Sequence, residues 1–275
     1  MAARRRGAIL CPFCGRLTNA DATVCLVCGH KHPGRWAFLA RLRSLYGRHG
    51  LTGAVTIACI ALYVVSLVFD PAAAIRPRGS FELFEPSGRA LLALGATGYD
   101  LWPAGHWWTV LTAIYLHGGI LHILFNVLWI RQLGPAVEEL YGPGRFFVIF
   151  TVSGALGFVV SDTIGIPFTV GASGSIFGLL GAMVAYGRKR GGTFGTLVLK
   201  QYGQWALLLF ILGFFMRSVN NYAHAGGFLG GFLAGLMLSF EDQRSETVLD
   251  HLLASACIGL TLIAFGLAWS SAFLS

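Results

Sequence analysis

Long apolar stretches, separated by short polar ones, constrain this sequence more than any other feature. Seven candidate membrane-spanning segments follow residue 51, at 52–69, 110–133, 146–163, 172–187, 203–217, 222–240 and 252–273. Charged residues make up only 12% of the chain, roughly half of the share that is usual in a globular domain. A helix needs ~20 apolar residues to cross a bilayer, and segments 172–187 and 203–217 are the shortest of the seven. We therefore expect an all-α membrane protein.

The positive charge is concentrated at the N-terminus. Residues 1–50 hold nine of the 20 Lys and Arg residues and one of the 12 acids, so the whole net charge of +8 lies there. A basic stretch can indicate nucleic-acid binding. Before an apolar segment it is more simply an orientation signal, because basic residues stay on the cytoplasmic side. We expect a cytoplasmic N-terminus, an extracytoplasmic C-terminus and no nucleic-acid partner.

Four cysteines near the N-terminus form a C-x2-C…C-x2-C pattern: Cys11, Cys14, Cys25 and Cys28. Four thiolates at this spacing can hold Zn²⁺ in a tetrahedron, whereas the alternative, two disulfides, is rare in the cytoplasm. A segment of about 30 residues buries too little apolar surface to fold without such a staple. We expect a structural zinc ribbon at 1–34 with a cytoplasmic protein as its candidate partner, a basic linker at 35–51 and a transmembrane domain at 52–275.

Polar side chains are costly inside membrane spans, yet three of the expected spans carry them near their outer ends. They are His117, His122, Asn126, Ser173 and His224. By the charge-derived orientation, all three spans start on the outer side of the membrane. We therefore expect these five residues in one layer.

Small residues favour a close approach of Ser173 and His224. At 100° per residue, Gly227 shares a helical face with His224, and Gly174 opens a strip of small residues on the helix of Ser173. Such faces let membrane helices pack backbone to backbone. Packing alone is the alternative explanation for them, but it does not explain why His224 lies on the same strip. If the two faces meet, His224 can take the proton of the Ser173 hydroxyl.

The surrounding residues indicate a Ser–His dyad rather than a triad, because the expected spans contain essentially no acids; Asp162 lies at the outer end of the third. The ring of Phe177, one turn after Ser173, is positioned to pack on His224. His122 and Asn126 share a helical face. With the backbone N–H of Ser173, these two side chains can stabilise a developing oxyanion.

Two further features belong to the outer side. Segment 70–109 is rich in aromatic residues, Gly and Pro, which is typical of a structured loop lying against the membrane. On an ideal helix, His117 points about 140° away from His122. We expect His117 to make a structural hydrogen bond to the outer loop rather than to take part in catalysis.

Three motifs follow one another in the sequence: H-x4-H-x3-N at 117–126, G-x-S-G at 171–174 and A-H-x2-G at 223–227. In this order they resemble the motifs of the rhomboid intramembrane serine proteases, over roughly residues 51–240. The resemblance implies a rhomboid-like six-helix bundle, here followed by one additional C-terminal transmembrane helix. It implies Ser173 as nucleophile and His224 as base. The oxyanion donors would be His122 and Asn126.

The resemblance also implies single-pass transmembrane proteins as substrates, cut near small residues, with the lipid bilayer as surroundings and no cofactor for catalysis. Gly171, Gly174 and Gly227 would support the site, and the location would be a bacterial inner membrane. The chain departs from the family at two places. It has Trp107-Trp108-Thr109 where many members have a Trp-Arg pair, and Phe177 where many have tyrosine.

Other classes of function fit less well. A non-catalytic rhomboid-like protein that binds membrane clients is the main alternative, but it would be expected to lack the serine or the histidine. A transporter with a histidine proton path would need acidic partners within the bilayer. A soluble α/β-hydrolase would need glycine where Ser175 stands.

Overall fold

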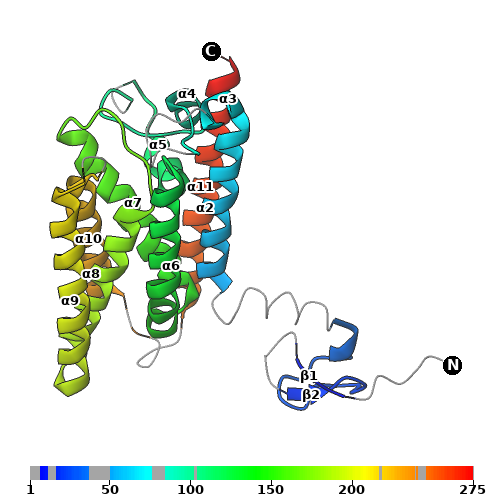
Figure 1. The fold of residues 1–275 in the computed structure, drawn as a ribbon. Helices are drawn as coiled ribbons and strands as arrows, with labels where there is room; N and C mark the ends of the chain where they lie inside the picture. The colour runs from blue at the N-terminus through cyan, green and yellow to red at the C-terminus, as the bar shows by residue number, and fades with distance from the viewer. Residues whose placement is uncertain are drawn as a thin grey trace.

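The computed structural model describes residues 7–11, 17–36, 50–75, 84–101, 104–216, 219–238, 240 and 246–274. In this part of the chain, the long helices are α2 (Gly50–Phe69), α6 (Ile120–Tyr141), α7 (Pro143–Thr163), α8 (Ser173–Arg190), α9 (Gly192–Phe214), α10 (Asn221–Met237) and α11 (Val248–Leu274), which stand side by side in a bundle (Figure 1). Among the described residues, five helices are long and apolar enough to cross a membrane: α2, α6, α7, α9 and α11. The predicted all-α, multi-pass membrane fold is confirmed.

The segment predicted as one span at 110–133 is two separate pieces. The chain first forms α5 (Thr109–Thr112) and η2 (Ala113–Tyr115), becomes extended at Leu116, and starts α6 only at Ile120. The consecutive glycines Gly118 and Gly119 lie in the break, where their low helix propensity favours an interruption. The expectation of a continuous helix was therefore wrong here.

The span predicted at 203–217 is present, but its start was placed too late, because α9 begins at Gly192 and is 23 residues long. The polar residues around Lys200 made the first half of α9 look unlike a membrane span in the sequence. Lysine and glutamine are nevertheless good helix formers. The two short helices are α8 and α10, with 18 and 17 residues.

The outer loop expected at 70–109 contains α3 (Pro71–Ile75) and α4 (Gly88–Ala93). Ser87 caps α4 by accepting a hydrogen bond from the N–H of Ala90 at 3.1 Å. Further along, the N–H groups of Thr97 and Thr169 donate to each other's carbonyl oxygens. This loop therefore braces the segment that leads to Ser173.

The N-terminal module contains β1 (Ala8–Leu10) and β2 (Leu17–Asn19), which pair antiparallel, and η1 (Pro33–Trp36). Cys14 and most of the expected basic linker lie outside the described residues. The division of the chain at 34 and 51 stays a prediction.

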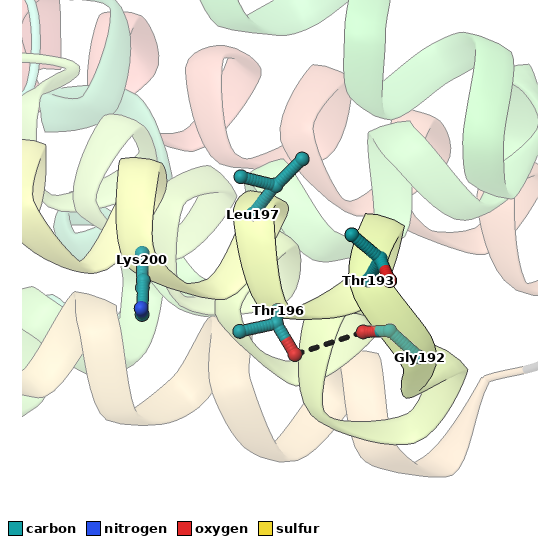
Figure 2. A pocket seen from close by; sticks show the side chains of 5 residues that line it. All are labelled: Gly192, Thr193, Thr196, Leu197 and Lys200. Atoms are coloured by element: carbon teal, nitrogen blue, oxygen red, sulfur yellow. Dashed lines mark hydrogen bonds between the residues drawn. The ribbon is translucent and has the colours of Figure 1, made fainter.

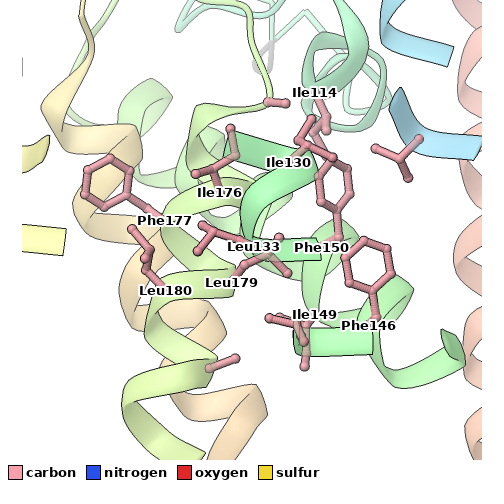
Figure 3. Close-up of a cluster of buried hydrophobic side chains, with 14 of the residues drawn as sticks. Ile114, Ile130, Leu133, Phe146, Ile149, Phe150, Ile176, Phe177, Leu179 and Leu180 are labelled. Atoms are coloured by element: carbon pink, nitrogen blue, oxygen red, sulfur yellow. The ribbon is translucent and has the colours of Figure 1, made fainter. Parts of the chain in front are cut away.

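The core lies where α8 meets α6 and α7, and it is filled by aliphatic and aromatic side chains (Figure 3). From Gly174 to Gly187, nearly every residue of α8 is buried. Ile130 and Leu133 from α6 and Phe146 and Phe150 from α7 belong to the same cluster. The N-terminal end of α8 is therefore held within the bundle rather than at its edge.

Helix α10 runs parallel to α8 with the two backbones in contact. A Cβ on Gly227 would overlap the carbonyl oxygen of Gly174, and a Cβ on Gly231 would overlap that of Gly178. One turn on, a Cβ on Gly235 would come 2.9 Å from the Cα of Ala182. The sequence separation is the same at each contact, so the first turns of the two helices lie at the same level.

We expect Gly231→Ala to lower the stability of the bundle by about 1–3 kcal/mol, because a methyl group cannot fit against the backbone of α8. Thermal unfolding in detergent measures this loss. Gly259→Ala is the matched control, since no atom lies within 4 Å of a Cβ built there. Equal melting temperatures for the two variants would contradict the backbone contact.

A buried ion pair joins α11 to the first turn of α7. Arg145 is 1% exposed, and its Nη2 lies 2.9 Å from Oδ2 of Asp250. The backbone N–H of Arg145 donates to Oε1 of Glu246 at 2.8 Å. Glu246 lies so close to Gly142 and Gly144 that a Cβ on either would come within 3 Å of its side chain. The seventh helix is thereby fastened to the bundle by polar contacts.

Candidate active site

Ser173 is the first residue of α8 and is half-buried. The first intrahelical hydrogen bond runs from the N–H of Ile176 to the oxygen of Ala172. The N–H groups of residues 173–175 therefore precede the helical ladder and remain available as donors. Just before them, the N–H of Gly171 donates to the oxygen of Ala113 at 2.9 Å, which fixes the loop that delivers Ser173.

His224 lies in the first turn of α10 and is 6% exposed. Its ring stacks on that of Phe177, with centroids 4.2 Å apart and planes at 16°. The ring contact expected for Phe177 is present. The ring of Phe210 from α9 also packs edge-on against Phe177, with ring centroids 6.4 Å apart.

The parallel pairing of α8 and α10 brings Ser173 and His224 to the same end of the two helices. Their side chains form no hydrogen bond to each other within the part of the chain that the structure describes. A catalytic hydrogen bond is often absent without substrate and tightens when substrate binds. The contact of Gly227 with Gly174 brings the first turns of the two helices, which carry Ser173 and His224, to the same level.

His122 and Asn126 occupy the first two turns of α6. The N–H of Gly118 donates to Nδ1 of His122 at 3.3 Å, so the proton of the neutral ring is on Nε2. That nitrogen faces Gly171, where a Cβ would come to 2.6 Å. With a φ of +129°, Gly171 is also in a conformation that side-chain-bearing residues rarely adopt. The Nε2–H donor thus points at the loop that precedes Ser173.

The amide of Asn126 donates from Nδ2 to the oxygen of His122 at 2.8 Å. The side chain is buried, and its Oδ1 has no hydrogen-bond partner among the described residues. Since Nδ2 carries two hydrogens, one remains available as a second donor.

His117 does not behave as predicted. It precedes α6, so the angle expected on a continuous helix does not apply, and its ring meets that of His122 at 5.1 Å and 64°. It is fully buried, and neither ring nitrogen forms a hydrogen bond within the described residues. The expected separation of His117 from His122 was therefore wrong, because the two rings pack together. The bond to the outer loop stays a prediction, since residues 76–83 and 102–103 of that loop lie outside the described residues.

The sequence reasoning missed the two asparagines at the start of α10. Oδ1 of Asn221 lies 3.2 Å from Nδ1 of His224, and Asn220 is the N-cap of the helix. The preference for asparagine at N-caps was the signal that could have identified Asn220.

Comparison with known proteins matches a Rhomboid domain to residues 104–241, half of the chain. The chain belongs to the rhomboid family. It is 38% identical over 169 residues to Rhomboid protease GluP of Bacillus subtilis, and this alignment covers 58% of this rhomboid and 32% of GluP. It is 36% identical to RHOMBOID-like protein 5 of Arabidopsis thaliana, with 58% and 53% of the two chains covered. To Rhomboid protease GlpG of Salmonella choleraesuis it is 31% identical, with 76% and 68% covered.

The similarity covers only part of several relatives. This rhomboid spans about a third of GluP and about half of RHOMBOID-like protein 5. The matched domain contains the residues of the candidate site, from His117 to Gly227.

A separate cluster of thiols lies in the N-terminal module. The sulfur atoms of Cys11, Cys25 and Cys28 all lie within 4.8 Å of one another, and those of Cys11 and Cys28 are 3.8 Å apart. That separation is too long for a disulfide but equals the edge of a tetrahedron with Zn–S distances of about 2.3 Å, which is about 3.8 Å. The donor set therefore fits zinc, with Cys14 outside the described residues.

The surroundings of Cys25 favour its thiolate. The backbone N–H groups of Cys28 and Val27 outweigh the effect of burial and lower the pKa of Cys25 to about 6. A thiolate is the form of cysteine that binds metal.

A shallow pocket lies at the start of α9, lined by Gly192, Thr193, Thr196, Leu197 and Lys200 (Figure 2). The hydroxyl of Thr196 donates to the oxygen of Gly192 at 2.8 Å. Since α9 begins just after α8 ends, this pocket lies at the opposite end of α8 from Ser173 and is no part of the candidate site.

Proposed function

We propose that this rhomboid is an intramembrane serine endopeptidase that cleaves transmembrane proteins near the extracytoplasmic side of the membrane with a Ser173–His224 dyad. The parallel, in-register contact between α8 and α10 carries this proposal, because it brings the first turns of both helices together. The relatives that are called rhomboid proteases support it.

In the first step, Nε2 of His224 takes the proton of the Ser173 hydroxyl while Oγ attacks the carbonyl carbon of the scissile bond. His224 then gives this proton to the leaving nitrogen, and the carbon–nitrogen bond breaks to leave an acyl-enzyme. In the second half, His224 takes a proton from a water molecule while the water oxygen attacks the ester carbon. The bond from that carbon to Oγ then breaks, and His224 gives the proton back to Oγ, which restores the Ser173 hydroxyl and releases the carboxylic acid. Stacking on Phe177 keeps the imidazole ring in its plane through both proton transfers.

The tetrahedral intermediates carry negative charge on the former carbonyl oxygen. We assign its stabilisation to the backbone N–H of Ser173, the Nε2–H of His122 and the amide of Asn126. The N-terminus of α8 adds its positive dipole end at the same place. Removing one such donor typically costs about 10²–10³-fold in rate.

The orientation follows from the basic residues. Arg188, Lys189 and Arg190 end α8, at the opposite end from Ser173, and basic residues favour the cytoplasmic side. We therefore propose that Ser173 faces the extracytoplasmic side, that the N-terminus is cytoplasmic and the C-terminus extracytoplasmic, and that the membrane is a bacterial inner membrane. Single-pass proteins with small residues near the outer membrane surface are the proposed substrates.

The experiment uses the full chain reconstituted in liposomes with a panel of fluorescently labelled single-pass substrates. We expect cleavage within or beside the transmembrane segment, and covalent labelling by a fluorophosphonate that mass spectrometry maps to Ser173. Substrate binding without cleavage or labelling would favour the alternative, a rhomboid-like protein that binds membrane clients.

We also propose that Cys11, Cys14, Cys25 and Cys28 hold one structural Zn²⁺. The ion would supply cross-linking for a module too small to fold on a core alone. With four thiolate ligands the site has no open position, so we assign it no part in peptide cleavage. A cytoplasmic protein is the proposed partner of this ribbon.

Zinc binding is tested directly on the purified full chain under reducing conditions. We expect about one zinc per chain by elemental analysis, and none after Cys11→Ser combined with Cys25→Ser. Cys257→Ser, which changes a thiol in α11, is the control and should keep the metal. A wild-type protein without zinc would overturn the proposal.

A further inference from the structure

Two adjacent asparagines at the start of α10 join the segments that the proposed chemistry must hold together. Asn220 is the N-cap of the helix, and its Oδ1 accepts a hydrogen bond from the N–H of Ala223 at 3.1 Å. That bond fixes the amide orientation, because only the oxygen can accept. The Nδ2 group must then face the other way, toward α7 and the loop before Ser173.

Nδ2 of Asn220 uses both of its hydrogens there. It donates to Oγ of Ser161, near the end of α7, at 2.6 Å. It also donates to Oγ1 of Thr169, four residues before Ser173, at 3.3 Å. One side chain thus ties the start of the helix that carries His224 to the loop that carries the nucleophile.

Asn221 contacts the histidine ring itself. Its Oδ1 lies 3.2 Å from Nδ1 of His224, and an amide oxygen can only accept. This bond places the proton of the neutral ring on Nδ1 and leaves the lone pair of Nε2 for the serine. A Cβ on Gly213 of α9 would overlap this oxygen, so the amide occupies a niche that only glycine leaves open.

We infer that Asn220 and Asn221 are positioning residues for His224: Asn220 holds the helix start against α7 and the loop before Ser173, and Asn221 holds the ring in the tautomer that a base requires. The inference rests on the proposed function. An amide does this work without placing a charge in a buried site, where a carboxylate would be costly.

The tautomer of His224 tests the role of Asn221. In full-length protein labelled with ¹⁵N-histidine, we expect ¹⁵N shifts of the Nδ1–H form for His224, identified by their loss in His224→Ala. Asn221→Ala should mix the two tautomers and lower kcat about tenfold, the worth of one hydrogen bond of about 1.4 kcal/mol, with little change in KM. Asn221→Asp, which keeps the acceptor, should restore the tautomer.

Gly213→Ala provides a second variant that leaves both the asparagine and the histidine unchanged. Its methyl group should displace Oδ1 of Asn221 and reproduce the tautomer mixing and the fall in kcat. An Nε2–H tautomer in the wild type, or an unchanged kcat in Asn221→Ala, would overturn the role of Asn221.

Asn220→Ser tests the hydrogen bonds of Asn220 to Ser161 and Thr169 separately from its role as N-cap. Serine is as good an N-cap as asparagine, but it is too short to reach Ser161. We expect kcat to fall about tenfold, and the double variant with Ser161→Ala to be no slower, since both remove one interaction. Unchanged kcat in Asn220→Ser, or full additivity with Ser161→Ala, would overturn this role.

The outcomes separate this inference from the proposed function. If the wild type neither cleaves substrates nor reacts with a fluorophosphonate, the proposed function fails while the ¹⁵N shifts still report the contact of Asn221 with His224. If the wild type cleaves and the asparagine variants are unaffected, the inference alone fails.

Discussion

Alanine in place of Ser173 or His224 is expected to lower the rate of substrate cleavage by at least about 10⁴-fold. Without the hydroxyl no acyl-enzyme can form. Without the imidazole of His224, the base that the proposed mechanism assigns to the serine proton is lost. The measurement is kcat for a labelled transmembrane substrate in liposomes.

The double variant sharpens this expectation. Because the proposed mechanism uses the two side chains in one proton transfer, removing both should cost no more than removing one. Ser175→Ala is the matched control: this hydroxyl is buried on the same helix, has no hydrogen-bond partner among the described residues, and should be dispensable. Independent, multiplying losses from Ser173→Ala and His224→Ala would mean that the two residues do not work as a pair.

The second large effect concerns the buried ion pair on α11. Asp250→Ala is expected to lower the free energy of unfolding by about 3 kcal/mol, because Arg145 is buried and cannot turn to water. Asp250 also accepts hydrogen bonds from the N–H and hydroxyl of Thr247, both at 2.7 Å, so the start of α11 loosens as well. Thermal unfolding in detergent measures the loss.

A compensating pair distinguishes lost charge pairing from lost packing. Arg145→Met combined with Asp250→Leu removes both charges while filling the space, and such replacements are often neutral or stabilising. We expect this double variant to recover most of the stability lost in Asp250→Ala. A double variant as unstable as the single one would show that the ion pair itself is not what holds α11.

Part of the site was readable from the sequence for a definite physical reason. Polar residues are rare in membrane spans, and the basic residues predict a direction for each span, so the sequence alone predicted that Ser173 and His224 lie at one level. The small-residue strips on their helices indicated the contact that Gly174 and Gly227 make. The ring of Phe177, at one helical turn from Ser173, followed from helical periodicity alone.

Other features depend on contacts between distant segments and could not be read in this way. Because the chain breaks before α6, His117 lies outside the helix and its ring packs against that of His122. A projection of the sequence onto an ideal helix does not show this contact. Asn221 and His224 are only three residues apart in the sequence, but the position of the Asn221 amide depends on the space left by Gly213 of another helix. The fastening of α11 by Arg145 and Asp250 spans 105 residues, beyond the reach of any local pattern.

The hydrogen bond from Arg145 to Glu246 also bears on how the protein is made. The N-cap residue of α7, Gly142, has no side chain to accept from the first turn, and the acceptor comes instead from a residue 101 positions later. During translation, α7 enters the membrane long before that acceptor exists. In a nascent chain with α2 to α10 already inserted, the backbone N–H of Arg145 therefore still lacks this acceptor. The hydrogen bond can form only after Glu246 and α11 have been synthesised.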